Sequence, residues 1–102
     1  MNKEKIYNNL SDLLKSSSWI KQESKSKFDI YIPPQKLNFE SDYRLYVYNK
    51  YENNDFENLT VKALEILSEI YQDMDFDDLC SIVMENRQVL SLHVNDDETT
   101  QG

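Results

Sequence analysis

Apolar residues recur with helical spacing between residues 54 and 72, NDFENLTVKALEILSEIYQ. At 100° per residue, the apolar side chains of this segment fall within one arc of about 160°. The arc consists of Phe56, Leu59, Ala63, Leu64, Ile66, Leu67, Ile70 and Tyr71. Asn54 and Glu57 have the spacing of a capping box, which satisfies amide donors at a helix start. The segment is therefore predicted to be a long amphipathic helix that covers one face of a sheet.

The residues before this helix predict one further helix and a small sheet. Residues 3–16 place five apolar side chains within about 120° of one another, which indicates an amphipathic helix. Residues 19–20 predict a short strand and residues 28–32, with alternating polarity, a second one. Residues 43–50, YRLYVYNK, have the aromatic and β-branched composition of a third strand.

Two more elements and a tail are predicted after the central helix. Asp75 and Asp78 have the spacing of a helix N-cap and its third helical position, so a helix of about ten residues follows. Residues 89–94, VLSLHV, predict a last strand, and residues 95–102 a polar tail or linker. We therefore predict one α+β domain over residues 1–94, with the order α-β-β-β-α-α-β and an antiparallel sheet of three to four strands.

Charge is distributed unevenly along the 102 residues, whose formal net charge is −8. Residues 1–50 carry nine basic and six acidic side chains, whereas residues 51–102 carry two basic and thirteen acidic ones. The second half therefore presents a negative field to a basic partner. It disfavours nucleic acid as the ligand, since phosphates require neutralising cations.

The acidic side chains of the central helix and of the segment after it are the main candidate site. They are Glu57, Glu65, Glu69, Asp73, Asp75, Asp77 and Asp78. Solvation of a helix surface is one interpretation of this set, and docking on a basic surface of another protein is the other. The second interpretation predicts a non-enzymatic interaction module, of the inhibitor, immunity or accessory-subunit type.

An aromatic face of the sheet is the alternative site. If Leu45 and Val47 face the central helix, Tyr46 and Tyr48 face away, and Tyr31 joins them if the strands align. This set consists of Tyr31, Tyr46 and Tyr48, with Arg44 beside it. It predicts either stacking of single-stranded nucleic acid, burial against the first helix, or pairing with a second copy in a homodimer.

Catalytic and metal-binding motifs are not found in the sequence. The single glycine, Gly102, leaves no glycine-rich phosphate loop, and the single histidine, His93, leaves no histidine pair for a metal. The aspartates after residue 72 fail as a calcium loop because Asp78 stands where glycine is needed and Met84 where glutamate is needed. We therefore expect no enzyme activity, no metal and no cofactor.

A cytoplasmic location is expected from two features. Cys80 is the only cysteine, so no internal disulfide can form. The first residues, MNKEKIYNN, lack the apolar run of a signal peptide, and no stretch is long and apolar enough for a membrane span. The frequent lysine, asparagine and isoleucine are typical of an AT-rich bacterial or phage genome, and we expect such an origin.

Overall fold

A computed structural model of the chain describes residues 2–84, which form a small α+β domain. The three helices are α1 (Lys3–Ser16), α2 (Phe56–Ile70) and α3 (Phe76–Met84). The strands β1 (Ile20–Lys25), β2 (Phe28–Ile32) and β3 (Leu45–Tyr48) form an antiparallel sheet in the order β1-β2-β3. A short 3-10 helix, η1 (Gln35–Leu37), interrupts the connection from β2 to β3. The strand predicted at residues 89–94 and the tail after it lie outside the described residues.

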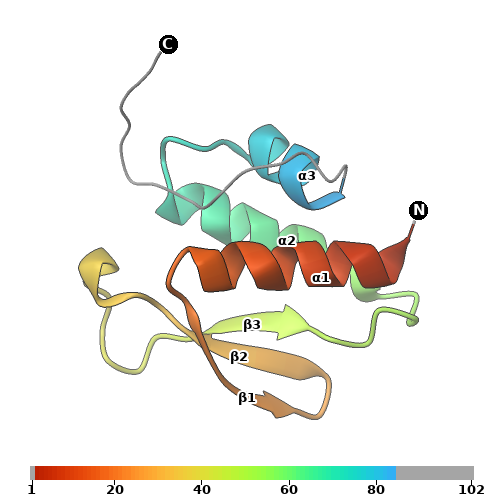
Figure 1. Cartoon of the computed structure of the whole chain (residues 1–102), viewed down its shortest axis with the longest axis horizontal. Helices are drawn as coiled ribbons and strands as arrows, with labels where there is room; N and C mark the ends of the chain where they lie inside the picture. The colour runs from red at the N-terminus through yellow and green to blue at the C-terminus, as the bar shows by residue number, and fades with distance from the viewer. Residues whose placement is uncertain (1, 85–102) are drawn as a thin grey trace.

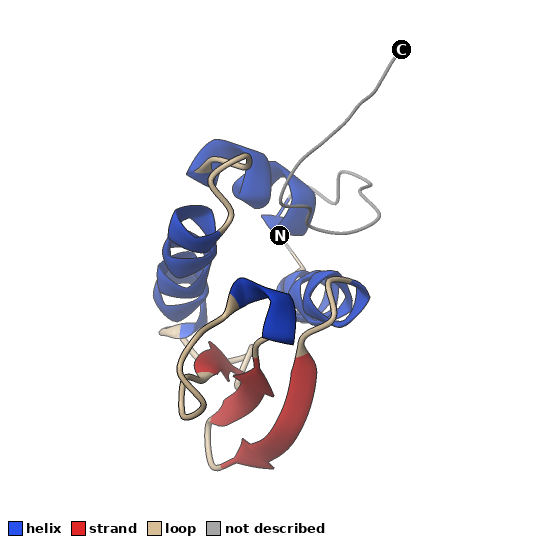
Figure 2. Cartoon of the chain, turned by 90° about the vertical axis from the view of Figure 1, so that its left-hand side faces the viewer, coloured by secondary structure: helices blue, strands red, loops and turns tan. Residues whose placement is uncertain are grey.

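The domain is arranged in layers (Figure 1). α1 and α2 lie over the same face of the sheet, and α3 lies on the side of these helices that is remote from the strands (Figures 1 and 2). The core occupies the space between the layers, and its largest fully buried side chains include Tyr31, Phe56, Leu64 and Leu79. No helix within residues 2–84 has the length and apolar character needed to cross a membrane.

α1 ends in a Schellman motif, which turns the chain toward the sheet. The Trp19 amide donates to the Leu14 carbonyl at 3.0 Å, and the Ser18 amide donates to the Lys15 carbonyl at 3.1 Å. Ser18 has the left-handed backbone (φ 75°) that glycine adopts most easily. The motif places Trp19 in the core, 2% exposed, where its indole N–H donates to the Tyr71 hydroxyl at 2.9 Å.

The strands differ from the prediction in length and in the side that each residue faces. β1 extends to Lys25, past the residues 19–20 predicted for it, and carries a bulge between Lys21 and Glu23. In β2, Asp29 pairs with Val47 and Tyr31 pairs with Leu45, so these four side chains share one face. That face meets α1, because the Tyr7 and Ser11 side chains of α1 contact Asp29 and Tyr31.

The N-terminal cap predicted for α2 is wrong, and the one predicted for α3 is correct. The predicted capping box of Asn54 is wrong, since α2 begins after Asp55, whose side chain makes no capping hydrogen bond. The Asn53 side chain instead accepts from the Asp55 amide at 2.8 Å. At α3 the predicted cap is present, because the Asp75 carboxylate accepts from the Asp78 amide at 2.9 Å.

Candidate functional site

Six of the seven predicted acidic residues are exposed on α2, α3 and the connection between these helices. Positions 56, 60, 63, 64 and 67 of α2 are buried against the core, which leaves Glu57, Glu65 and Glu69 exposed on the opposite side. Asp73, Asp75 and Asp77 are also exposed, and Asp78 is half-buried. We call these seven side chains the acidic surface.

Local structure explains some of these carboxylates and leaves others unexplained. Asp75 caps α3, and Asp77 and Asp78 lie in its first turn, where the helix dipole favours negative charge. Glu65 and Glu69 have no such role, because they lie in the middle and last turn of α2. In the last turn of a helix the dipole disfavours negative charge, so Glu69 costs a little helix stability where it stands.

Acidic side chains greatly outnumber basic ones in the part of the sequence that carries the acidic surface. Within residues 51–84 there are nine acidic side chains and one basic one, Lys62. The two ion pairs found in residues 2–84 both lie in the β1–β2 hairpin and involve Asp29 and Glu23. The glutamates of α2 therefore keep their charge available to an approaching molecule.

The three tyrosines predicted to share an exposed aromatic face do not share one, and of the alternatives weighed for this set, burial against the first helix is found for Tyr31. Tyr31 is fully buried on the helix side of the sheet, where its hydroxyl contacts the Ser11 hydroxyl at 3.1 Å. Tyr46 and Tyr48 share the outer face, but Tyr48 is only 3% exposed and packs edge-on against Phe28. Tyr46 is thus the one member of the predicted set that is exposed, at 54%.

Arg44, predicted to lie beside that aromatic face, covers the strand next to it. Its Nε donates to the Gln22 side chain at 2.8 Å, and its Nη1 donates to the carbonyls of Ser41 and Tyr43 at 3.0 and 2.7 Å. Gln22 belongs to β1 and Arg44 precedes β3, so this bridge crosses β2. Ile30 of β2, whose partner in β3 is Tyr46, is 6% exposed.

The buried carboxylate of Asp29 is a feature that the sequence reasoning missed. Asp29 is 1% exposed and accepts hydrogen bonds from the Tyr7 hydroxyl, from the Ser24 hydroxyl at 2.6 Å and from the Asn49 amide at 3.0 Å. Lys21 lies 3.9 Å away. The alternating polarity of residues 28–32 predicted only a strand. Side chains from α1, β1 and residue 49 satisfy the Asp29 carboxylate in the interior.

Within this cluster, the pKa of Asp29 and the pKa of Tyr7 are shifted in opposite directions. Burial raises the pKa of Asp29, but the three hydrogen bonds and the Lys21 charge outweigh it, so the pKa lies below the usual value. The pKa of Tyr7 is raised, first by burial and then by its hydrogen bond to the Asp29 carboxylate and by that charge. The cluster therefore holds an ionised carboxylate beside a neutral phenol, which is an arrangement that stabilises the fold.

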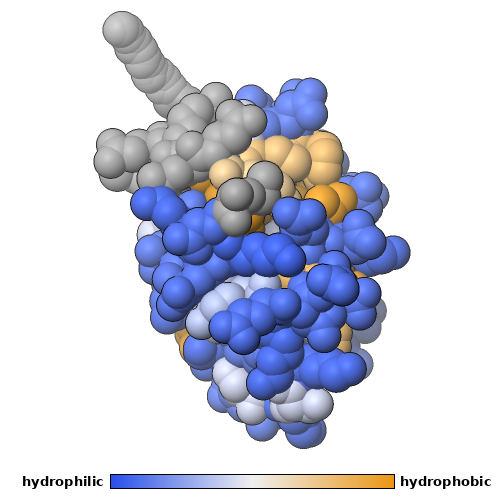
Figure 3. All heavy atoms as spheres, turned by 90° about the vertical axis from the view of Figure 1, so that its right-hand side faces the viewer, coloured by the Kyte–Doolittle hydropathy of each residue, from blue (hydrophilic) through white to orange (hydrophobic). Residues whose placement is uncertain are grey.

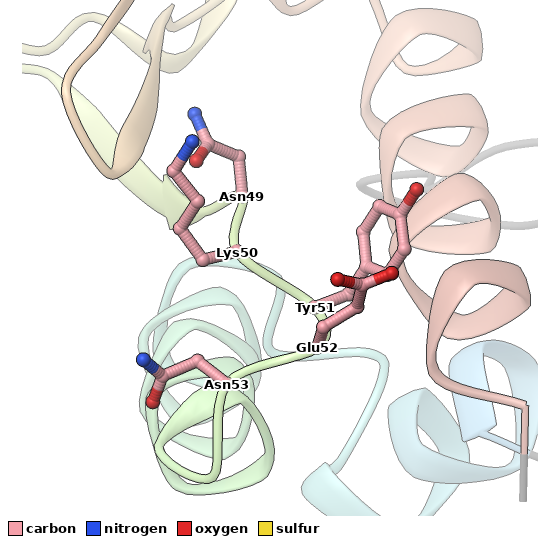
Figure 4. A pocket seen from close by; sticks show the side chains of 5 residues that line it. All are labelled: Asn49, Lys50, Tyr51, Glu52 and Asn53. Carbon is pink, nitrogen blue, oxygen red and sulfur yellow. The ribbon is translucent and has the colours of Figure 1, made fainter.

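A hollow of about 510 Å³ lies beside the connection from β3 to α2 and is lined by residues 49–53 (Figure 4). The side chains of Asn49 and Lys50 extend toward the strands, those of Tyr51 and Glu52 toward α1, and that of Asn53 away from both (Figure 4). Their polar groups do not converge on a shared point, as a specific ligand would require. The end of the molecule that carries this hollow is predominantly hydrophilic (Figure 3).

The opposite end carries a groove of about 370 Å³ beside the connection from β2 to β3. The apolar part of its lining is formed by Ile32, Pro33, Pro34 and Phe39, and Glu40 and Arg44 are among its polar lining residues. Phe39 is 37% exposed and stacks on Tyr43, with ring centroids 4.4 Å apart.

Comparisons of the chain with protein-family models, with curated proteins and with solved structures found no match. Within residues 2–84, no three His, Cys, Asp or Glu side chains lie close enough together to hold a metal ion. The functional interpretation therefore depends on the surface geometry and charge described above.

Proposed function

We propose that this protein is a non-enzymatic interaction module that docks on a basic surface of another protein through the acidic surface of α2 and α3. Roles of the inhibitor, immunity or accessory-subunit type fit this mode of binding. The proposal includes a cytoplasmic setting and a bacterial or phage origin. Carboxylates held on a folded surface can occupy the positions that phosphates occupy on a nucleic-acid-binding partner, and their field accelerates encounter.

The observation that supports the proposal most directly is the exposure of Glu65 and Glu69. Neither carboxylate caps a helix or forms an ion pair within residues 2–84, and Glu69 stands where the α2 dipole opposes it. Stability of the fold alone gives no reason for this charge at this position. Docking on a basic partner gives one.

Charge reversal tests the proposal. In Glu65→Lys/Glu69→Lys the formal net charge changes by +4, from −8 to −4. The matched control, Asp12→Lys/Glu23→Lys, makes the same change at exposed positions of α1 and β1. Each protein is immobilised, exposed to lysate of its native cells at several salt concentrations, and the captured proteins are identified.

We expect wild type and control to capture the same basic protein and the α2 variant to lose it. Rising salt should weaken the wild-type complex, since exposed charges are screened within about 10 Å at 0.1 M salt. Equal capture by all three proteins would show that the acidic surface does not bind the partner. Circular dichroism of each variant verifies that the helices remain folded.

A further inference from the structure

Strand β2 has its polar side chains on the helix side of the sheet and its apolar ones on the outer side. Asp29 and Tyr31 contact side chains of α1. Phe28, Ile30 and Ile32 alternate with them and therefore lie on the outer face, whereas α1, α2 and α3 lie on the other side of the sheet (Figures 1 and 2). A sheet face that meets water commonly carries polar side chains, but the central strand of this sheet presents three apolar ones.

The two neighbouring strands add apolar side chains to the same face. Cross-strand pairing places Ile20 of β1 opposite Ile32, and Tyr46 of β3 opposite Ile30. Ile20 is 63% and Tyr46 54% exposed, the two highest values among the large hydrophobic side chains of residues 2–84. The half-buried Phe28 ring packs edge-on against Tyr46, with centroids 6.0 Å apart. We call these five side chains the outer strip.

Charged side chains of both signs border the outer strip. Glu23 and Lys25 of β1 lie on the outer face and form an ion pair at 4.0 Å. Arg44, just before β3, donates to the Gln22 side chain of β1. An apolar centre with a polar, solvent-accessible rim is the composition of a protein–protein interface.

Charge favours a second copy of this chain as the occupant of the outer strip. Residues 20–50, which form the sheet and its connections, carry six basic and four acidic side chains, whereas the whole chain has a formal net charge of −8. Two copies therefore repel one another least where their sheets meet. A basic partner of the acidic surface gains no attraction there, because Lys25 and Arg44 border the outer strip.

The apolar run at residues 89–94 starts too far from the outer strip to cover it. It begins five residues after Met84, the end of α3, so its first residue reaches at most about 18 Å from Met84. α3 lies beyond α1 and α2, and two packed layers of about 10 Å each separate it from the sheet. At most the end of the run extends to the outer face.

We propose that the chain forms a two-fold symmetric dimer in which the outer strips of two copies pack face to face, as the two sheets of a β-sandwich do. The inference is independent of the proposed function, because the acidic surface belongs to α2, α3 and their connection and stays open in such a dimer. Three strands of four to six residues cover only about 14 Å by 20 Å. The dimer is therefore transient, with a dissociation constant on the order of 100 µM.

Sedimentation equilibrium of the full chain tests the dimer, at concentrations from about 10 µM to 1 mM. We expect the average mass to rise with concentration from that of one chain toward that of two. Salt should strengthen the dimer, because it screens the repulsion between two chains that each carry −8. A complex of the acidic surface with a basic partner is weakened by salt, so the two proposals are tested separately.

Substitution of Ile20 tests the place of the contact. Ile20→Ser should lower the association constant about tenfold, because it removes the most exposed apolar side chain of the outer strip. The matched control is Ile66→Ser, which removes a 40% exposed isoleucine of α2 and should leave the association constant unchanged. On dilution of wild type, NMR should show chemical-shift changes at the amides of Ile20, Phe28 and Tyr46. Circular dichroism confirms the folding of each variant.

Three results would overturn the inference. One is a mass of a single chain at every concentration. Another is an equal loss of association in Ile20→Ser and Ile66→Ser, which would place the contact outside the outer strip. The third is a shift of the Tyr46 amide by a single-stranded oligonucleotide but not by dilution, because nucleic acid would then be the occupant.

Discussion

Removal of the Asp29 carboxylate should destabilise the fold more than removal of any exposed acidic group. Asp29→Ala deprives three donors of their acceptor: the hydroxyls of Tyr7 and Ser24 and the side-chain amide of Asn49. It also leaves Lys21, whose side chain is 35% exposed, without its carboxylate at 3.9 Å. The donors come from α1, β1 and the segment after β3, so the loss loosens the helix layer and the sheet together.

The size of the effect follows from opposing terms. A hydrogen bond to a charged group contributes about 1.5–3 kcal/mol, and three such bonds are lost. Burial of the carboxylate itself costs several kcal/mol, which the substitution recovers in part. Lys21 and the half-buried Tyr7 can reach water. We expect a net loss of about 2–4 kcal/mol in the free energy of unfolding, out of the roughly 5–15 kcal/mol typical of a small domain.

Urea unfolding followed by far-ultraviolet circular dichroism measures this loss. The control is Asp12→Ala, which removes an exposed carboxylate of α1 and should change the free energy of unfolding by less than about 0.5 kcal/mol. A loss below about 1 kcal/mol for Asp29→Ala would refute the reasoning, because the hydrogen bonds would then barely exceed the cost of burying the charge.

The pH dependence of stability gives the same prediction a second readout. The folded pKa of Asp29 lies below its unfolded value, so the unfolded chain binds more protons as the pH falls. The contribution of Asp29 is therefore complete above about pH 4 and decreases below it, as the pH approaches the folded pKa. In Asp29→Asn this part of the acid destabilisation should be missing. If the free energy of unfolding of Asp29→Asn decreases at low pH in the same way as that of wild type, Asp29 is not the group responsible.

Three further substitutions have signs that the structure fixes, each measurable by thermal and urea unfolding. Ser18→Gly should stabilise by about 0.5–1 kcal/mol, because it relieves a left-handed serine in the Schellman motif. Tyr71→Phe should cost about 1–3 kcal/mol by leaving the buried Trp19 N–H without its acceptor, and the environment of the tryptophan should change in fluorescence. Thr60→Val should stabilise by about 1 kcal/mol, since the buried Thr60 hydroxyl has no hydrogen-bond partner within residues 2–84. A change of opposite sign would contradict the corresponding local argument.

The sequence predicted the secondary structure well where the signal is local. Helical spacing of apolar residues placed α1 at residues 3–16, its observed bounds, and placed α2 within residues 54–72. The predicted cap at Asp75 is confirmed, and the helix that it begins buries Leu79, Ile82 and Val83. Local periodicity is enough for these features because each depends only on which side of one helix meets the core.

The prediction was wrong about which face of the sheet the side chains of β2 occupy, and the reason is energetic. A strand exposes alternate residues on two faces, and the choice between faces depends on partners from elsewhere in the chain. Tyr31 was predicted to face away from the central helix, but Asp29 and Tyr31 face the helices because Tyr7, Ser11 and Asn49 satisfy their polar groups there. Arg44 and Gln22 meanwhile bridge across the outer face.

Of the two candidate surfaces, the exposed glutamates of α2 could be predicted from the sequence and the groove beside the β2–β3 connection could not. Exposure of Glu57, Glu65 and Glu69 follows from the apolar arc of α2, so the sequence alone determined it. The groove could not be predicted, because it needs the proline pair after β2, the left-handed turn at Asn38 and the stack of Phe39 on Tyr43 to meet in space. Sequence spacing fixes what one helix presents to solvent, whereas only tertiary packing decides which segments enclose a hollow, since its walls come from contacts that no single periodicity encodes.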